Sequence, residues 1–330
     1  MDLYEWKVKN ATARKYAHFD EKVSLDKVWN YISNPDNIMK HGFYPFIHYE
    51  KKFNKFTKKD GMGYIKEKSR HLCYSAHIDR YIYSYYGYLL NQKYNITEAD
   101  FLSSEIEVVP AFKARSLGFD GSMVAAYGQD DKICAYTSLS ALMTLENIKT
   151  TAVCILSDKE EIGSMGNTGM ESHMFDYFIS ELLNKTGENR PNLLDKVFCF
   201  SRMLSADVDA GYDPLYASVS DRNNAAFLGR GIGLNKYTGA RGKSGASDAN
   251  AEFVAWIRRV LEKNDIRYQI SELGKVDVGG GGTIAYILAN KGVDVIDCGV
   301  PVLSMHAPYE VTSKFDVYTA YRTYKAFWEE

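Results

Sequence analysis

The chain has 330 residues, of which 45% are hydrophobic and 25% charged, with a formal net charge of -2 and a pI near 6.4. This length can bury a sizeable core, and the composition is typical of a globular protein. The balanced charge excludes the broad basic field that nucleic acids or anionic membranes select. No window approaches the roughly 20 apolar residues that cross a bilayer, and the N-terminus lacks the apolar core of a signal peptide. We expect a cytoplasmic protein with no nucleic-acid and no membrane partner.

The five cysteines lie far apart in the chain and form no CxxC pair. Neither a disulfide framework nor a thiolate zinc site is therefore indicated. Four of the five lie inside apolar runs such as TAVCIL, so we expect buried, reduced thiols.

The character of the sequence changes near residue 105. Before it the chain is polar, rich in Lys, Tyr and Asn, and weakly periodic; after it, apolar runs alternate with helical patterns. Short β-rich runs predict strands at 151–157, 196–204, 267–273 and 293–299. Helices are predicted at 136–148, 171–185, 249–264, 282–292 and 317–330. This alternation predicts an α/β fold of three layers, α/β/α, with a mainly parallel central sheet.

Acidic and imidazole side chains recur where predicted strands end, which is where an open α/β sheet places its ligands. An aspartate in such a place is usually a helix cap or turn residue, and a Glu-Glu pair is usually a solvated surface run. The pair Glu160 and Glu161, however, lies between an apolar run and a Gly-rich loop, where two repelling carboxylates are costly without a cation. The side chains singled out are Asp130, Asp131, Glu160, Glu161, Asp207, His306 and His77, with Asp79 two residues later.

Together these residues fit zinc chemistry. Two zinc ions a few ångströms apart take histidine nitrogens and carboxylate oxygens, share one carboxylate, and leave a position for water. A neighbouring glutamate that is not a ligand can then take the proton of that water. An aspartate two residues from a ligand histidine can hydrogen-bond its second ring nitrogen and fix its tautomer.

Five segments resemble successive motifs of the M18 aspartyl aminopeptidases, in particular the bacterial branch. They cover about residues 97–330 in order and with matching spacing. The segments are LSSEIEVVPAFKARSLGFDGSMVAAYGQDDKICAYTSLSAL (102–142), SDKEEIGSMGNTG (157–169), LSADVDAGYDP (204–214), GKVDVGGGGTIA (274–285) and GVPVLSMHAPYE (299–310).

The resemblance implies a zinc exopeptidase-like catalytic domain over 1–330, with a metal-binding core at 101–330 and a divergent N-terminal part at 1–100. It implies two zinc ions per chain, for which Co or Mn could substitute. Asp130 would bridge the two ions, and Glu161 and His306 would complete one site. Asp207 would hold the other ion together with His77, the histidine of an HxD motif. Glu160 would be the general base, and Asp79 would orient His77; both are counted as catalytic.

The chain also departs from the family pattern. Members of the family carry an inserted assembly domain after the HxD motif, and the interval from Asp79 to Asp100 is too short to hold it. We therefore expect a remnant near 80–100 and a monomer or a simple dimer, since any self-association would lack the usual assembly domain. The family motif continues Ser-Pro-Arg where this chain reads HIDRYIY. His77 is thus either a ligand beside a deletion or a coincidental histidine in a divergent remnant.

The resemblance predicts a metallo-aminopeptidase acting on peptides, with acidic N-terminal residues often favoured in the family. Basic residues near the C-terminal motifs could supply a matching charge, although loops are commonly basic; these are Lys236, Arg241, Lys243 and Lys275. Two alternatives stay open. One is a catalytically impaired relative that acts as a binding or assembly protein, and the other is a different dizinc hydrolase, such as a deacylase or carboxypeptidase, on the same fold.

Overall fold

The structure of the chain is a computed structural model. It describes residues 3–11, 23–43, 47–59, 62–74, 76–105, 107–146, 148–188, 190–241, 243–275, 278 and 280–330. The chain divides into two compact units, unit 1 at Met1–Val108 and unit 2 at Val109–Glu330. The assignment of 1–330 to a single catalytic domain stays a prediction.

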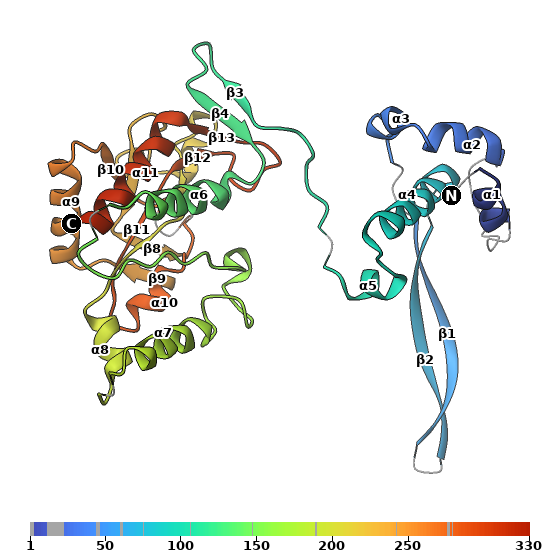
Figure 1. Cartoon of the computed structure of the whole chain (residues 1–330), viewed down its shortest axis with the longest axis horizontal. Coiled ribbons are helices and arrows are strands. Elements are labelled where there is room, and N and C mark those ends of the chain that lie inside the picture. Colours follow the sequence, from blue (N-terminus) through green and yellow to red (C-terminus); the bar gives the residue numbers. More distant parts are fainter. Residues whose placement is uncertain are drawn as a thin grey trace. The chain divides into compact units, whose positions relative to one another are not determined.

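Unit 1 combines a small helical cluster with a long hairpin. In α2, Ser24 caps the N-terminus by accepting from the backbone N–H of Lys27, and Val28 and Ile32 fall on one face. That face packs with the buried Trp6 of α1 and Ile82 of α4. The hairpin pairs β1 with β2 in antiparallel register (Figure 1). The elements are α1 (Leu3–Ala11), α2 (Leu25–Ile32), α3 (Pro35–Met39), β1 (Ile47–Lys59), β2 (Met62–Tyr74), α4 (His77–Tyr94) and α5 (Glu98–Ser103).

Unit 2 holds the remaining helices and strands. They are β3 (Arg115–Leu117), β4 (Met123–Ala126), α6 (Gln129–Met143), the 3-10 turn η1 (Glu160–Ile162), α7 (Met174–Lys185), α8 (Leu193–Cys199), β5 (Arg202–Ser205), β6 (Asp209–Ala210), the 3-10 helix η2 (Pro214–Val219), β7 (Ile232–Asn235), β8 (Tyr237–Ala240), β9 (Ser244–Asp248), α9 (Ala251–Lys263), β10 (Tyr268–Ser271), α10 (Ala285–Ala289), β11 (Asp294–Gly299), β12 (Pro301–Leu303), β13 (Glu310–Ser313) and α11 (Lys314–Glu329).

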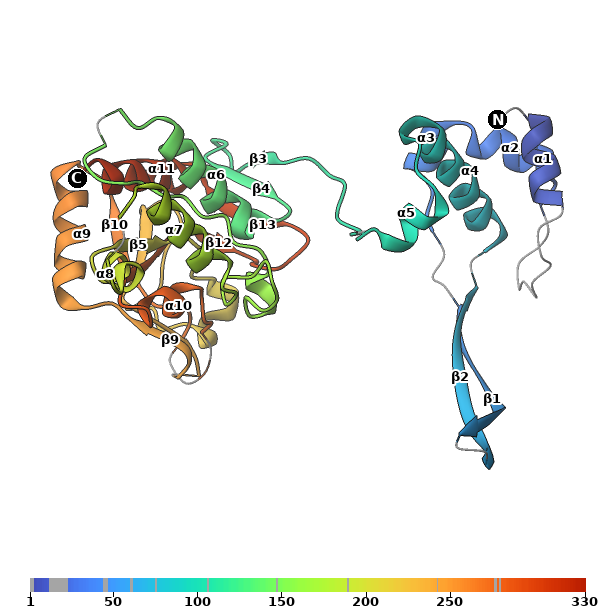
Figure 2. The same ribbon diagram turned by 60° about the horizontal axis from the view of Figure 1, so that its bottom comes forward.

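A four-stranded sheet, in the order β10-β7-β11-β5, forms the middle layer of unit 2. Strand β11 alternates between two apolar cores, as the period of two along a strand requires. Val295 faces the core built with α7, α8 and α10, whereas Ile296 and Cys298 face the core built with α6, α9 and α11. Helices therefore cover both faces of the sheet, and α6 packs along α11 (Figure 1, Figure 2). This is the predicted α/β fold with three layers.

Strand directions are more mixed than the sequence predicted. In the four-stranded sheet β10–β7 and β11–β5 are parallel, but β11 runs antiparallel to β7. A second sheet, in the order β3-β4-β13-β12-β6, is antiparallel except for the pair β12–β6. Its pairing of Glu310 with Ala126 brings the loop before β13 next to the start of α6. This second sheet thus positions two segments that carry candidate ligands.

Two of the predicted strands differ in the structure. Residues 151–157 form no strand, and the only bridge nearby joins Asp158 to Gly169. This apolar run lies along the wall of a cavity, so its side chains are partly covered without a backbone ladder. The predicted strand 196–204 begins as α8, and β5 starts only at Arg202. Cys199 at the end of α8 is exposed, contrary to the expectation of buried thiols, whereas Cys134 and Cys298 are buried.

Candidate metal centre

Asp130 and Asp131 lie at the start of α6, shortly after the end of β4. Gly128 has a φ of 67°, a left-handed conformation that glycine adopts easily, and it turns the chain into the helix. Asp130 and Asp131 have non-helical dihedral angles, and the peptide bond between them is cis. Both residues are partly buried, and the side chain of Asp130 is only 8% exposed. The turn therefore presents two consecutive carboxylates ahead of the regular part of α6.

Glu160 and Glu161 occupy the short turn η1. It is closed by backbone hydrogen bonds from Gly163 to the carbonyl of Glu160 and from Ser164 to that of Lys159, both at 2.8 Å. Gly163 follows with a φ of 85°. Glu160 is half-buried and Glu161 is exposed. The two carboxylates thus differ in environment although they are adjacent in sequence.

His306 lies in the loop between β12 and β13 and brings two of these carboxylates together. Its Nε2 lies 3.0 Å from Oδ2 of Asp130 and 3.1 Å from Oε1 of Glu161. The three residues each offer one ligand atom, and these atoms lie within 4.8 Å of one another. Imidazole nitrogen with carboxylate oxygen is a donor set that zinc accepts. The cluster therefore fits a metal ion.

The carboxyl groups around this cluster crowd one another. Burial, followed by the charge of Glu161, raises the pKa of Asp130 to about 6. Burial, followed by the charges of Glu161 and Asp130, raises the pKa of Glu160 to about 7. Because like charges and burial both disfavour ionised carboxylates, a bound cation would favour the charged forms.

Asp207 and Asp131 extend the acidic cluster. Burial raises the pKa of Asp207 well above its usual value, and the charges of Asp131 and Glu160 add to the effect. The pKa of Asp131 is raised to about 8, again chiefly by burial. Asp207 follows β5, and its Oδ1 accepts a hydrogen bond from the backbone N–H of Val208 at 2.8 Å. These interactions link Asp207 electrostatically to the residues around His306.

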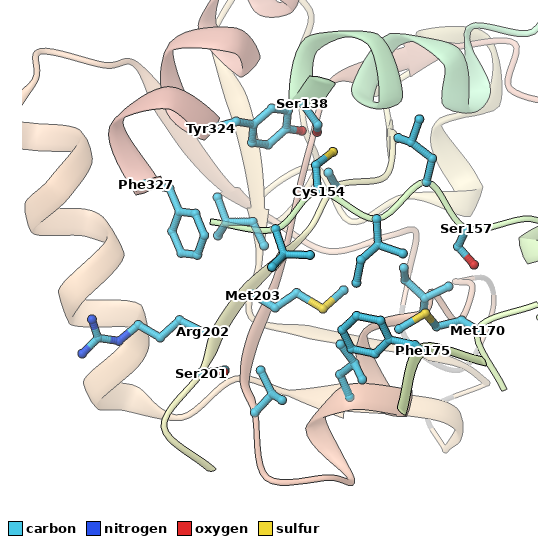
Figure 3. A pocket seen from close by; sticks show the side chains of 18 of the residues that line it. Ser138, Cys154, Ser157, Met170, Phe175, Ser201, Arg202, Met203, Tyr324 and Phe327 are labelled. Atoms are coloured by element: carbon cyan, nitrogen blue, oxygen red, sulfur yellow. The ribbon is translucent and has the colours of Figure 1, made fainter. Parts of the chain in front are cut away.

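A cavity of about 1180 Å³ reaches this acidic cluster. Its lining includes Asp130, Asp131, Glu160, Glu161 and Asp207, and the rest is mainly apolar. Figure 3 shows Cys154, from the 151–157 run, and Met203 of β5 among the lining side chains, with Tyr324 and Phe327 of α11. The carboxylates therefore border an apolar space, which agrees with burial being the largest cause of their raised pKa values.

His77 and Asp79 belong to unit 1. His77 is the first residue of α4 and is buried, and Asp79, two residues later in the same helix, is buried too. Asp79 Oδ1 lies 2.7 Å from Nε2 of His41, a histidine that the sequence analysis did not single out. The cluster in unit 2 brings together Asp130, Glu161 and His306. The assignment of His77 as a ligand and of Asp79 as its orienting residue stays a prediction.

Sequence reasoning also missed Glu310, the first residue of β13. Its buried carboxylate accepts hydrogen bonds from backbone N–H groups next to the cluster. The available signal was a carboxylate at the head of a strand, four residues after His306, inside a motif that already contained a candidate ligand.

Comparison with known proteins identifies the family of the chain. The family model described as "Aminopeptidase I zinc metalloprotease (M18)" matches residues 22–328. The chain belongs to the M18 family. A probable M18 family aminopeptidase 1 from Clostridium acetobutylicum is 54% identical over 239 residues, which are 72% of this chain and 51% of the relative. One from Thermotoga maritima is 48% identical over 243 residues, 73% of this chain and 54% of the relative.

Solved structures of M18 members share the fold. The crystal structure of aminopeptidase I from Clostridium acetobutylicum has a TM-score of 0.68 at 53% identity, covering 74% of this chain and 52% of that one. The M18 aminopeptidase from Thermotoga maritima has a TM-score of 0.71 at 38% identity, covering 85% of this chain and 70% of that one. The chain thus spans about half the length of the curated relatives it matches. Among the described residues, no helix is long and apolar enough to span a membrane.

Proposed function

We propose that this chain is a zinc-dependent aminopeptidase that removes residues from the N-termini of peptides. The observation that carries the proposal is the cluster of Asp130, Glu161 and His306, with Glu160 beside it in the same turn. Membership of the M18 family supports the proposal.

In this proposal Asp130, Glu161 and His306 would hold one zinc ion. Asp207 would serve as a ligand of a second ion. Support for the second ion comes from Asp207, which lines the same cavity as Asp130 and Glu160. Burial raises its pKa, and the charges of the neighbouring acids Asp131 and Glu160 raise it further. When bound, zinc lowers the pKa of a ligand water and polarises a scissile carbonyl.

Glu160 is the residue we assign as general base. It lies next to the candidate ligand Glu161 in the same turn, and it is not one of the three residues whose ligand atoms converge, so its carboxylate stays available for a proton. Its carboxylate would take a proton from the attacking water and pass it to the leaving amine. The proposed preference for substrates with an acidic N-terminal residue rests only on the resemblance to the family. Lys236, one of the cations considered for that role, is paired with Asp248.

The first test measures bound metal. The protein is stripped with a chelator, reconstituted with zinc and assayed for zinc per chain. About two ions per chain is expected if both sites are present, whereas one ion would reject the second site and none would reject the proposal.

A matched pair of histidine variants locates the metal. His306→Ala is expected to lower zinc affinity at least about tenfold, because it removes a ligand. His173→Ala is the control, because the side chain of His173, at the N-cap of α7, is 99% exposed and is not one of the three residues of the cluster. Equal zinc affinity in the two variants would remove His306 from the site.

The activity test compares peptides that differ only at the amino terminus. Release of the first residue from free peptides, but not from N-acetylated ones, is expected of an aminopeptidase. Cleavage only of blocked peptides or from the C-terminus would instead favour a deacylase or carboxypeptidase. Peptides that begin with Asp, Glu or Leu, compared by kcat/KM, test the acidic preference.

A further inference from the structure

Glu310 makes an unusual set of contacts for a carboxylate. It is 2% exposed, and its Oε2 accepts from the backbone N–H of Gln129 at 2.5 Å and of Asp130 at 3.2 Å. Its Oε1 accepts from the backbone N–H of His306 at 2.8 Å. One side chain thus connects the backbones of two candidate ligands that lie far apart in sequence.

These N–H groups supply the hydrogen bonds that the buried carboxylate of Glu310 needs, a role that a cation could otherwise fill. Among the ion pairs between described residues none includes Glu310, and a buried carboxylate is costly unless hydrogen bonds or charges compensate it. The side chain of Gln129, also buried, strengthens the junction by donating to the backbone carbonyl of Glu310. Hydrogen bonds from the side chain of Glu310 and from the side chain of Gln129 therefore both connect the start of β13 to the start of α6.

The loop that carries His306 has a backbone conformation that requires stabilising contacts such as the hydrogen bonds of Glu310. Ser304 and His306 have φ angles of 57° and 64°, in the left-handed region that is unfavourable for residues other than glycine. A conformation of this kind persists where the surroundings fix it. Within the loop, a backbone hydrogen bond joins Ala307 to Ser304, and the bond to Glu310 holds the N–H of His306 itself. Loss of that bond would free the histidine to move relative to Asp130.

We infer that Glu310 is a positioning residue, which holds the backbones of Asp130 and His306 at the spacing that lets their side chains bind one metal ion. The inference rests on the proposed metal site and adds to it a residue that need not touch the metal. A carboxylate is required because a carboxamide offers one acceptor oxygen, whereas both oxygens of Glu310 accept from N–H groups.

The decisive variant is Glu310→Gln, with affinity for Zn²⁺ and Co²⁺ measured by competition against a chromophoric chelator. The amide NH₂ of the glutamine would face a backbone N–H donor, so the hydrogen bonds on one side, to either α6 or His306, are lost. We expect metal affinity to fall about 10- to 100-fold, as when groups that orient metal ligands are removed. We also expect the visible Co²⁺ spectrum to change, because the ligand geometry shifts.

Asp316→Asn is the matched control. Asp316 is also fully buried in unit 2 and also accepts from two backbone N–H groups, those of Gly229 and Gly231, at 2.6 and 2.7 Å. Neither glycine is a candidate ligand. This variant is expected to keep metal affinity and the Co²⁺ spectrum within about twofold of the wild type, whatever it does to thermal stability. An equal loss in both variants would mean a general effect of destabilisation and would overturn the inference.

Glu310→Asp covers the case in which Glu310→Gln does not fold. It keeps the charge but is one methylene shorter, so it cannot reach both backbones, and we expect weaker metal binding here too. A folded variant of either kind that binds metal like the wild type overturns the inference while leaving the proposed function intact. If the wild type itself binds no metal, or binds it independently of His306, the proposed site fails and this inference fails with it.

Discussion

Glu160 and Glu161 are neighbours in sequence, yet the structure separates their roles. Glu161 points to His306, whereas Glu160 makes no ion pair among those between described residues and is the more buried of the two. A ligand needs a fixed lone pair toward the metal, and a base needs a carboxylate free to exchange a proton. The two environments match the two proposed roles.

Glu160→Gln is expected to lower kcat by about 10²- to 10⁴-fold while zinc content stays unchanged, because the change removes a base and keeps the shape of the side chain. Activity is followed with a free N-terminal peptide, and zinc is measured on the same sample. Near wild-type turnover would reject Glu160 as base. Loss of zinc would instead place Glu160 among the ligands.

The buried carboxyl of Asp316 should make the free energy of unfolding depend on pH, independently of any metal. Burial raises its pKa from 3.8 to about 6. The unfolded chain therefore loses this proton first, so between pH 4 and 6 the folded state binds more protons, and its stability falls as the pH rises. The shift corresponds to roughly 3 kcal/mol at neutral pH relative to pH below 4.

Asp316→Asn removes this titration. The difference in free energy of unfolding, wild type minus variant, should fall as the pH rises from about 4 to about 6 and stay constant above about 7. Urea denaturation at a series of pH values measures it. A difference that does not change with pH would show that Asp316 titrates alike in the folded and unfolded states.

At the scale of elements, amphipathic patterns identified the helices of unit 2 well. Each predicted helix overlaps an observed one, although α6 begins at Gln129, before the predicted start at residue 136. The early start could not be read from periodicity, because Asp130 and Asp131 have non-helical angles and Gln129 is held by Glu310 from β13. The run at 151–157 shows the opposite error, since β propensity describes fit to a pleated surface and cannot specify a pairing partner.

Helix α9 depends on a single buried stripe, and Phe253 is its largest member at 2% exposure. Phe253→Ala should lower the free energy of unfolding by about 3 to 5 kcal/mol, because it leaves a cavity between α9 and the sheet. Phe200→Ala is the control, since Phe200 is 90% exposed and its loss should cost less than about 0.5 kcal/mol. Chemical denaturation measures the free energy of unfolding of the two variants. Equal losses in both would show that burial does not determine the effect.

At the scale of the whole molecule, the boundary between the two units lies in an extended stretch. Residues 107–114 form no helix or strand, and Val108 is 97% exposed. Exposed backbone of this kind is a preferred site of proteolysis.

Brief digestion with a glutamate-specific protease should therefore cut first after Glu105 or Glu107. A fragment beginning in this stretch and ending at Glu330 should persist, as judged by intact mass and N-terminal sequencing. Replacing both glutamates by glutamine should delay its appearance. First cuts inside α6 to α11 would show that unit 2 is not the resistant part of the chain.

The sequence alone determined the α/β class, the helices of unit 2, two of its central strands and the three residues of the candidate metal cluster, because these follow from local periodicity and from short motifs. It did not determine the antiparallel pairing of β11 with β7, the open run at 151–157 or the contacts of Glu310. Each of those depends on which distant segment supplies the hydrogen-bonding partner. Tertiary structure decided them, because a backbone N–H or a buried carboxylate is satisfied by whatever the fold brings beside it, and local sequence does not encode that neighbour.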